Sequence, residues 1–302
     1  MAIPFRFDAL ASIVQATLGW VTLGLVLLIV IPFGGNQPVV WSLTAFLVLG
    51  LFAVQLALSF VQPTAPALRR AALPVMLYTA VIVWALVQNG VPVPEGLAHP
   101  LWSIAPGEPT PLIGADPGQG AHVALRLATY GMVAWILAAS ALKARRAWAF
   151  LMAFAVFSTL LALYAIVAGL TGVNPVLGGS AGIAGQFTAT FINRNSYVTY
   201  AAFGMLANIA CYLHLAGDVG GGDSRTALRN FLETFFSRAW IFAMGALLCG
   251  AAVALTESRG GGAAAVAGLL VLIAAHVTRR RGGTGALWGV LAVVVGFVVV
   301  AL

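Results

Sequence analysis

Two segments of this chain carry residue types suited to binding an anion, and the first is FINRNSYVTY, residues 191–200. Asn193 and Asn195 flank Arg194 directly before an apolar run, and Asn195 or Ser196 is expected to cap the helix that follows. A helix start presents free N–H groups and the positive end of the helix dipole, which both favour anions. The guanidinium adds a planar fork of donors that matches phosphate oxygens. The alternative interpretation is an ordinary capped helix start with an arginine at the membrane interface.

The second segment is LTESRGGG, residues 255–262, and it also stands directly before an apolar run. Ser258 and Arg259 supply polar donors, and Gly260 lets the backbone approach a ligand closely. Glu257 is expected either to pair with an arginine or to orient a substrate hydroxyl. A glycine-rich turn between two helices is the alternative interpretation. Together the two segments predict a cationic site that holds a diphosphate without a metal.

The composition places these segments in a membrane protein. Hydrophobic residues make up 61% of the 302 residues and charged residues only 8%, whereas a typical soluble domain has about 25% charged residues. So few charges cannot cover a water-facing surface, which excludes a cytosolic enzyme, a disordered tail and a secreted disulfide scaffold. The net charge of +7 is typical of basic loops on the cytoplasmic side of a membrane. No nucleic-acid partner is therefore expected.

Nine apolar runs are candidates for membrane-spanning helices, each of which needs about 20 residues. Their continuous Ala-, Leu- and Val-rich character favours helices over the alternating strands of a β-barrel. The expected fold is all-α, a polytopic transmembrane helix bundle that forms a single integral membrane domain, 1–302. The expected helices are 11–33, 39–60, 71–90, 121–141, 147–171, 197–216, 239–256, a short glycine-rich 262–277, and 285–302.

The positive charges gather on one side of this expected topology. With the N-terminus in the cytoplasm, 12 of the 15 Lys and Arg residues fall on the cytoplasmic face, in agreement with the positive-inside rule. They are Arg6, Arg69, Arg70, Lys143, Arg145, Arg146, Arg225, Arg229, Arg238, Arg279, Arg280 and Arg281. Only Arg126, Arg194 and Arg259 fall on the outer face. Both anion-binding segments are therefore expected at the same membrane surface.

Arg126 belongs to neither segment, and only its position about one turn into the fourth expected helix implicates it. An arginine near the hydrocarbon is costly unless it reaches the headgroups or finds a partner. Arg126 is expected either to join the substrate site or simply to extend toward lipid headgroups. The outer loop 91–120 before this helix is rich in proline and is expected to be irregular.

The two cysteines, Cys211 and Cys249, fall within expected helices and lack the spacing of a disulfide or metal site. They are expected to pack as small apolar residues. No metal or other cofactor is expected.

The two segments, in this order and separated by one membrane hairpin, resemble the O-antigen ligase/polymerase family of bacterial membrane glycosyltransferases. Members often show an aromatic-x-Asn-Arg-Asn/His helix start, followed by a Ser-Arg-Gly-Gly turn before another helix. The resemblance covers 147–302, whereas the helices and outer loop of 1–146 contribute no motif. The candidate catalytic residues are Arg194 and Arg259, and the candidate substrate-binding residues are Arg126, Asn193, Asn195, Glu257, Ser258 and Gly260.

The resemblance implies a multi-pass protein of the bacterial inner membrane that acts at the periplasmic face in surface polysaccharide synthesis. Such an enzyme takes a glycan from an undecaprenyl-pyrophosphate carrier and passes it to a hydroxyl of lipid A-core, of a growing glycan or of a protein. The two arginines would hold the pyrophosphate leaving group and stabilise its growing charge. A general base would deprotonate the acceptor hydroxyl.

The C-terminal part departs from the family. Similar proteins continue with a large periplasmic loop, which brings a histidine proposed as general base, and then with further helices. The chain is therefore expected to be a fragment, one half of a split protein or an inactive truncated form. His99 and His122 are expected outside and could act as bases, although a loop or interfacial histidine is the simpler interpretation. His214 and His276 are expected near the cytoplasmic ends of their helices.

A transporter or lipid-carrier protein that binds an anionic substrate at the outer face is the alternative function. Transporters commonly show internal repeats and polar groups near the bilayer midplane. In this chain the polar groups concentrate at one interface, which favours the glycosyltransferase. A structural membrane scaffold would explain the hydropathy but not the two arginine-bearing helix starts.

Overall fold

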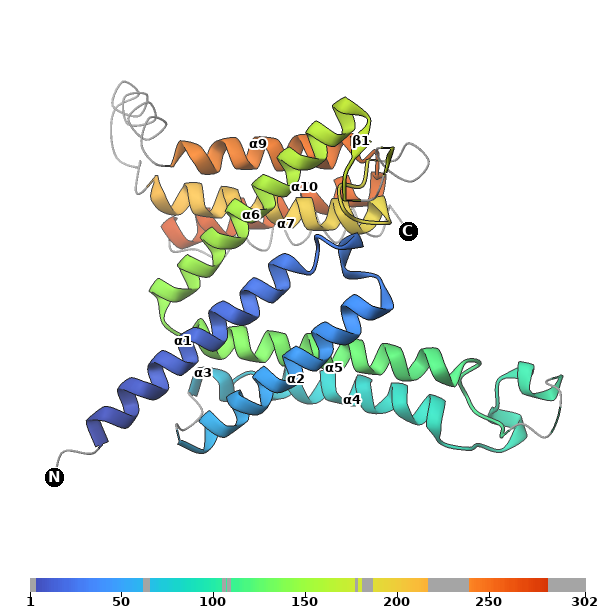
Figure 1. The fold of residues 1–302 in the computed structure, drawn as a ribbon. Coiled ribbons are helices and arrows are strands. Elements are labelled where there is room, and N and C mark those ends of the chain that lie inside the picture. Colours follow the sequence, from blue (N-terminus) through green and yellow to red (C-terminus); the bar gives the residue numbers. More distant parts are fainter. Residues whose placement is uncertain are drawn as a thin grey trace, which may run out of the picture. The chain divides into compact units, whose positions relative to one another are not determined.

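The structure is a computed structural model and describes residues 4–61, 66–104, 107, 110–176, 179–180, 187–216 and 239–281. Within these ranges the chain is helical apart from turns, short 3-10 segments and one small antiparallel ladder, β1 (Val173–Asn174) with β2 (Gly179–Ser180) (Figure 1). The predicted predominance of helices is therefore confirmed for the described part of the chain.

The long helices follow the apolar runs of the sequence, because each run is bounded by proline, glycine or charged residues that favour turns and helix ends. They are α1 (Pro4–Leu28), α2 (Pro38–Val61), α4 (Ala72–Gly90), α5 (Pro117–Ser140), α6 (Ala144–Thr171), α7 (Arg194–Leu215), α9 (Trp240–Leu255) and α10 (Arg259–Arg281). The short elements are α3 (Pro66–Arg69) and the 3-10 segments Phe33–Gly35, Glu95–Leu97 and Pro100–Ser103.

Seven helices in the described ranges are long and apolar enough to cross a membrane, which is compatible with a multi-pass membrane protein. The helix that was expected to be short, 262–277, is instead the 23-residue α10, and α9 is the shorter one with 16 residues. The ninth expected helix, 285–302, lies outside the described residues. The count of nine and the side of the N-terminus therefore stay predictions.

The chain divides into two compact units. Unit 1 comprises Met1–Val26 and Pro38–Ala147, and unit 2 comprises Leu27–Gln37 and Trp148–Leu302. The link between α1 and α2 therefore belongs to unit 2, although both helices lie mainly in unit 1.

In unit 1 a polar network joins three apolar helices. The Gln15 side-chain amide on α1 donates to Gln55 Oε1 on α2 at 2.8 Å and to Ser140 Oγ on α5 at 2.9 Å. The Ser140 hydroxyl in turn donates to the main-chain carbonyl oxygen of Gln15 at 3.0 Å. Such bonds between helices give buried polar groups the partners that lipid cannot supply.

In unit 2 the helix directions follow from residue pairs that lie opposite one another. Gly204 on α7 lies against Cys249 on α9, and Asn208, one turn later on α7, lies against Gly245, one turn earlier on α9. The two helices are therefore antiparallel neighbours, as Figure 1 also shows.

Helices α7 and α10 run in the same direction, unlike α7 and α9. Val198 lies against Gly261, and Leu206, two turns later, lies against Gly268. Because both positions advance together, α7 and α10 run parallel. The starts of these two helices therefore lie at the same end of unit 2.

Asn208 provides a polar centre between α6, α7 and α9. It is buried, and its side-chain amide donates to the Ala155 carbonyl at 3.2 Å, to Thr159 Oγ1 at 3.1 Å and to the Gly204 carbonyl at 2.8 Å. The bonds to Ala155 and Thr159 connect α7 to α6, while the absence of a side chain at Gly245 leaves room for the amide beside α9.

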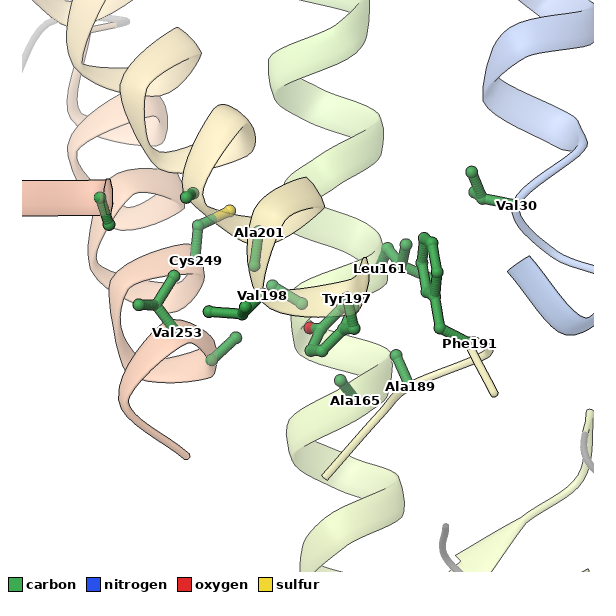
Figure 2. Packing of buried hydrophobic residues seen from close by; sticks show 14 residues of the cluster. Val30, Leu161, Ala165, Ala189, Phe191, Tyr197, Val198, Ala201, Cys249 and Val253 are labelled. Atoms are coloured by element: carbon green, nitrogen blue, oxygen red, sulfur yellow. The ribbon is translucent and has the colours of Figure 1, made fainter. Parts of the chain in front are cut away.

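Small side chains dominate the core of unit 2, which lets the helices approach closely. The cluster in Figure 2 includes Ala165, Ala201 and Cys249 beside the larger Tyr197 and Phe191. Its alanines and its cysteine fill the short distance between helix backbones, while the two aromatic rings close the end at which α7 begins.

We predict that Gly245→Ala destabilises the protein, because a Cβ at this position would overlap the Asn208 and Thr159 side chains that the hydrogen bonds hold in place. Overpacking of this kind costs about 1–3 kcal/mol. The measurement is thermal unfolding of the purified chain in detergent.

The matched control is Gly250→Ala on the same helix, where the new Cβ would make only an ordinary contact with Met205 Sδ at 3.5 Å. This control should be neutral or more stable, since alanine favours a helix over glycine by up to about 1 kcal/mol. Equal melting temperatures of the two variants would contradict the packing described for Gly245.

Candidate functional site

Helix α7 begins with an asparagine cap. Asn193 is the N-cap residue, and its side-chain oxygen accepts the Asn195 N–H at 2.7 Å. The expected caps, Asn195 or Ser196, are therefore wrong by two or three positions. Asn193 is the cap because its backbone is extended, which is the conformation that an N-cap residue adopts. Arg194 consequently becomes the first residue of the helix.

Helix α10 begins in the same way at the end of a tight turn. Thr256 is buried and its Oγ1 accepts the Ser258 N–H at 3.3 Å, while Glu257 adopts a left-handed backbone with φ of 53°. Ser258 Oγ then accepts the Gly261 N–H at 3.3 Å, which is an N-cap bond. Arg259 therefore holds the first helical position, as Arg194 does on α7.

The glycines after Arg259 differ from the sequence expectation, which began the helix only at Gly262. The structure includes Gly260, Gly261 and Gly262 in the first turn of α10. Packing outweighs the low helix propensity of glycine here, because a Cβ at Gly261 would overlap Val198 of α7. Gly260 faces open space, so the backbone at this position is accessible to a ligand.

A hydrogen bond joins the two helix starts. The Ser258 hydroxyl donates to Asn195 Oδ1 at 2.9 Å, between residues that stand 63 positions apart in the chain. Ser258 thus caps its own helix and holds the neighbouring one at the same time. The two sequence segments are therefore brought together, each with an arginine at the first position of its helix.

The two arginines differ in exposure. Arg194 is half-buried and Arg259 is exposed. Within the described ranges neither guanidinium has a carboxylate partner, and Glu257, which is exposed, forms no ion pair there. The pairing expected of Glu257 is thus not seen, and a role toward a substrate hydroxyl stays a prediction.

The loop that leads into α7 is anchored by Asn174, which is buried. The Tyr164 hydroxyl of α6 donates to Asn174 Oδ1 at 2.5 Å, and the Asn174 amide donates to the Ala189 carbonyl at 2.7 Å. These bonds hold the chain shortly before Asn193. Sequence reasoning did not single out these residues, and the only signal is an asparagine before proline, which favours a turn.

The link between α1 and α2 fixes the same loop from the other side. The Thr190 hydroxyl donates to the Val30 carbonyl at 2.6 Å. Phe191 packs against Gly34, whose φ of 65° and missing side chain suit this close contact. Figure 2 shows Phe191 between the start of α7 and Val30. The loop therefore has little freedom in placing Arg194.

Arg126 belongs to unit 1, whereas Arg194 and Arg259 belong to unit 2. Helix α5 begins at Pro117, four residues before the expected start, with Asp116 as N-cap. Arg126 therefore stands in the third turn rather than the second. Its guanidinium carbon lies 4.8 Å from the centre of the Trp41 ring.

The histidines occupy local roles in the described structure. His99 Nδ1 accepts the Leu101 N–H at 3.2 Å and caps a 3-10 segment. His122 lies edge-on to Trp41 at 5.5 Å between ring centres, and His214 stacks on Trp148 at 3.6 Å. None of these contacts assigns a general base.

Cys211 and Cys249 are free and buried within the helices of unit 2. Cys249 lies in the core cluster with Ala201 and Ala252, as expected for a small packing residue.

Comparisons of the chain with family models, with curated proteins and with solved structures found no match.

We predict that Ser258 and Asn195 are energetically coupled. Ser258→Ala removes a cap and the bond between the helices, and the cap alone contributes about 1 kcal/mol, whereas Asn195→Ala removes only the bond. A double-mutant cycle on the free energy of unfolding should give a coupling of about 0.5–1.5 kcal/mol.

Ser196→Ala is the matched control, since this exposed serine stands beside Asn195 but has no side-chain hydrogen bond within the described residues. It should change stability by less than about 0.5 kcal/mol. Additive effects of Asn195→Ala and Ser258→Ala would show that the two helix starts are not joined by this bond.

Proposed function

We propose that this chain is a membrane glycosyltransferase of the O-antigen ligase type, or part of one. It would transfer a glycan from an undecaprenyl-pyrophosphate carrier to an acceptor hydroxyl. The observation that supports the proposal is the hydrogen bond between Ser258 and Asn195, which joins the two arginine-bearing helix starts at one end of unit 2.

The arrangement suits a diphosphate. Among the first N–H groups of α7 and α10, the caps take those of Asn195 and Gly261, and the remaining ones have no partner within their own helices. The two parallel dipoles present their positive ends together. Arg194 and Arg259 add two full positive charges that no carboxylate in the described ranges neutralises. A doubly charged anion between lipid and water therefore finds charge, donors and accessible backbone at one place.

The same groups suit the chemistry of glycan transfer. As the acceptor oxygen attacks the anomeric carbon, the bond from that carbon to the diphosphate oxygen breaks, and negative charge grows on the leaving group. Preorganised arginines stabilise this charge more in the transition state than in the ground state, which is how such donors accelerate a reaction. A general base takes the proton of the acceptor hydroxyl.

The proposal includes a place of action and partners. The enzyme would lie in the bacterial inner membrane with the starts of α7 and α10 at the periplasmic face. It would act in surface polysaccharide synthesis on lipid A-core, a glycan or a protein. The polyprenyl tail of the donor would remain among membrane lipids, since the helices below the two arginines are apolar.

The position of the arginines favours this function over a transporter. Both stand at the first turn of their helices, whereas the charged groups of transporters concentrate near the bilayer midplane.

We predict that Arg259→Ala and Arg194→Ala each lower glycan transfer by about 100-fold or more, the loss expected when one preorganised donor to the developing charge is removed. The assay is transfer in proteoliposomes that contain the full-length protein and an undecaprenyl-pyrophosphate glycan. Arg259→Lys should retain only part of the activity, because lysine keeps the charge but loses the planar fork.

Arg145→Ala, an exposed arginine at the start of α6, is the matched control and should leave both transfer and membrane insertion unchanged. Transfer that persists in Arg259→Ala would refute the assignment. Uptake of the lipid-linked glycan without product would refute it in favour of a carrier protein.

A further inference from the structure

A second group of polar side chains, Trp41, His122 and Arg126, lies in unit 1 at the adjacent N-terminal parts of α2 and α5. The Arg126 guanidinium stacks on the Trp41 ring at 4.8 Å, and His122 meets the edge of the same ring at 5.5 Å. His122 and Arg126 stand four residues apart on α5, so they lie on one face of that helix.

Two donors of this group have no acceptor among the described residues. Arg126 Nε and Trp41 Nε1 are both buried, and neither forms a hydrogen bond there. A buried donor without an acceptor is costly, and the cost is larger for a charged group. These two donors therefore require an acceptor that the described part of the protein does not provide.

No carboxylate among the described residues neutralises the charge of Arg126. Asp116, the cap of α5, accepts the Gln119 N–H and stands ten residues before Arg126, which is about 15 Å along the helix. Within the described ranges the guanidinium has no ion pair. A half-buried arginine in the third turn of an apolar helix requires a counter-charge or must extend to the headgroups.

The contact with Trp41 limits how far the Arg126 side chain can extend toward lipid headgroups. A guanidinium held over an indole ring by a cation–π contact has less freedom than an extended side chain, so Arg126 serves as a more localised donor. Helix α5 begins nine residues earlier with the polar segment PGQGAH, and Arg126 stands one turn after His122. If α5 crosses the membrane, this polar start is expected near the headgroups, where lipid phosphates lie.

We infer that Trp41, His122 and Arg126 form a binding site for the phosphodiester of one anionic phospholipid. A single guanidinium matches a single negative charge, whereas a diphosphate would leave further charge unpaired at this place. His122 is exposed and Arg126 is half-buried, so a phosphate can approach both, and the buried Arg126 Nε and Trp41 Nε1 donate to it after a small shift of their side chains. Tyr130, one turn deeper on the same face and 60% exposed, offers a ring along which an acyl chain can lie.

This site is independent of the glycosyltransferase proposed above. It lies in unit 1 and requires none of the residues at the starts of α7 and α10. An inactive protein could therefore still bind the phospholipid, and an active one could lack it.

The test measures binding of dioleoyl phosphatidylglycerol to the purified full chain in a neutral maltoside detergent, by native mass spectrometry. Dioleoylglycerol, which has the same chains but no phosphate, should not bind specifically. Arg126→Ala should weaken phosphatidylglycerol binding about tenfold or more, the factor that one lost charge-assisted hydrogen bond implies. Trp41→Phe, which keeps the ring but removes the N–H, should weaken binding by a smaller factor.

The controls are Arg69→Ala and Trp84→Phe, which change an exposed arginine and an exposed tryptophan of the same unit and should bind like the unchanged protein. Arg126→Lys, which preserves the charge if Arg126→Ala fails to fold, should show intermediate binding. Equal binding by Arg126→Ala and the unchanged protein would overturn the site, as would an equal loss in Arg69→Ala. Dependence on Arg126 for undecaprenyl diphosphate but not for phosphatidylglycerol would overturn the phospholipid assignment.

Discussion

Close approach of α7 to α9 and α10 is the constraint on which the rest of unit 2 depends. Helices in lipid gain no hydrophobic free energy by associating, so they depend on close packing and on hydrogen bonds between helices. Gly245 and Gly261 remove side chains where Asn208 and Val198 need the space. The parallel course of α7 and α10 follows from these contacts, and with it the common end at which both helices begin.

At that end, the residues that cap the helices differ from the two arginines that we propose to bind the ligand. Asn193 and Ser258 satisfy N–H groups of their own helices, and Ser258 also holds Asn195. The arginine after each cap is consequently free of structural hydrogen bonds in the described ranges. A charge at a fixed helix start that no described carboxylate neutralises is compatible with the anion site that we propose.

The polar side chains of unit 1 form two groups that differ in their hydrogen bonding. Gln15, Gln55 and Ser140 satisfy one another between three helices. The Arg126 guanidinium instead lies over the Trp41 ring, and the buried Arg126 Nε and Trp41 Nε1 have no acceptor among the described residues. The contrast indicates that the first group stabilises the helices, whereas the second suits a ligand from the membrane.

The sequence by itself determined the helical class, the approximate helix bounds and the two arginine-bearing segments, because apolar runs and capping residues are local signals. It misplaced the cap of α7, where the backbone conformation of Asn193 decides, and began the eighth helix at residue 262 instead of Arg259, because the packing of Gly261 against α7 is not visible in the sequence. Only the tertiary structure joined Asn195 to Ser258 across 63 residues and anchored the loop through Asn174. Such contacts arise from packing between distant helices, which leaves no periodic trace in a single sequence.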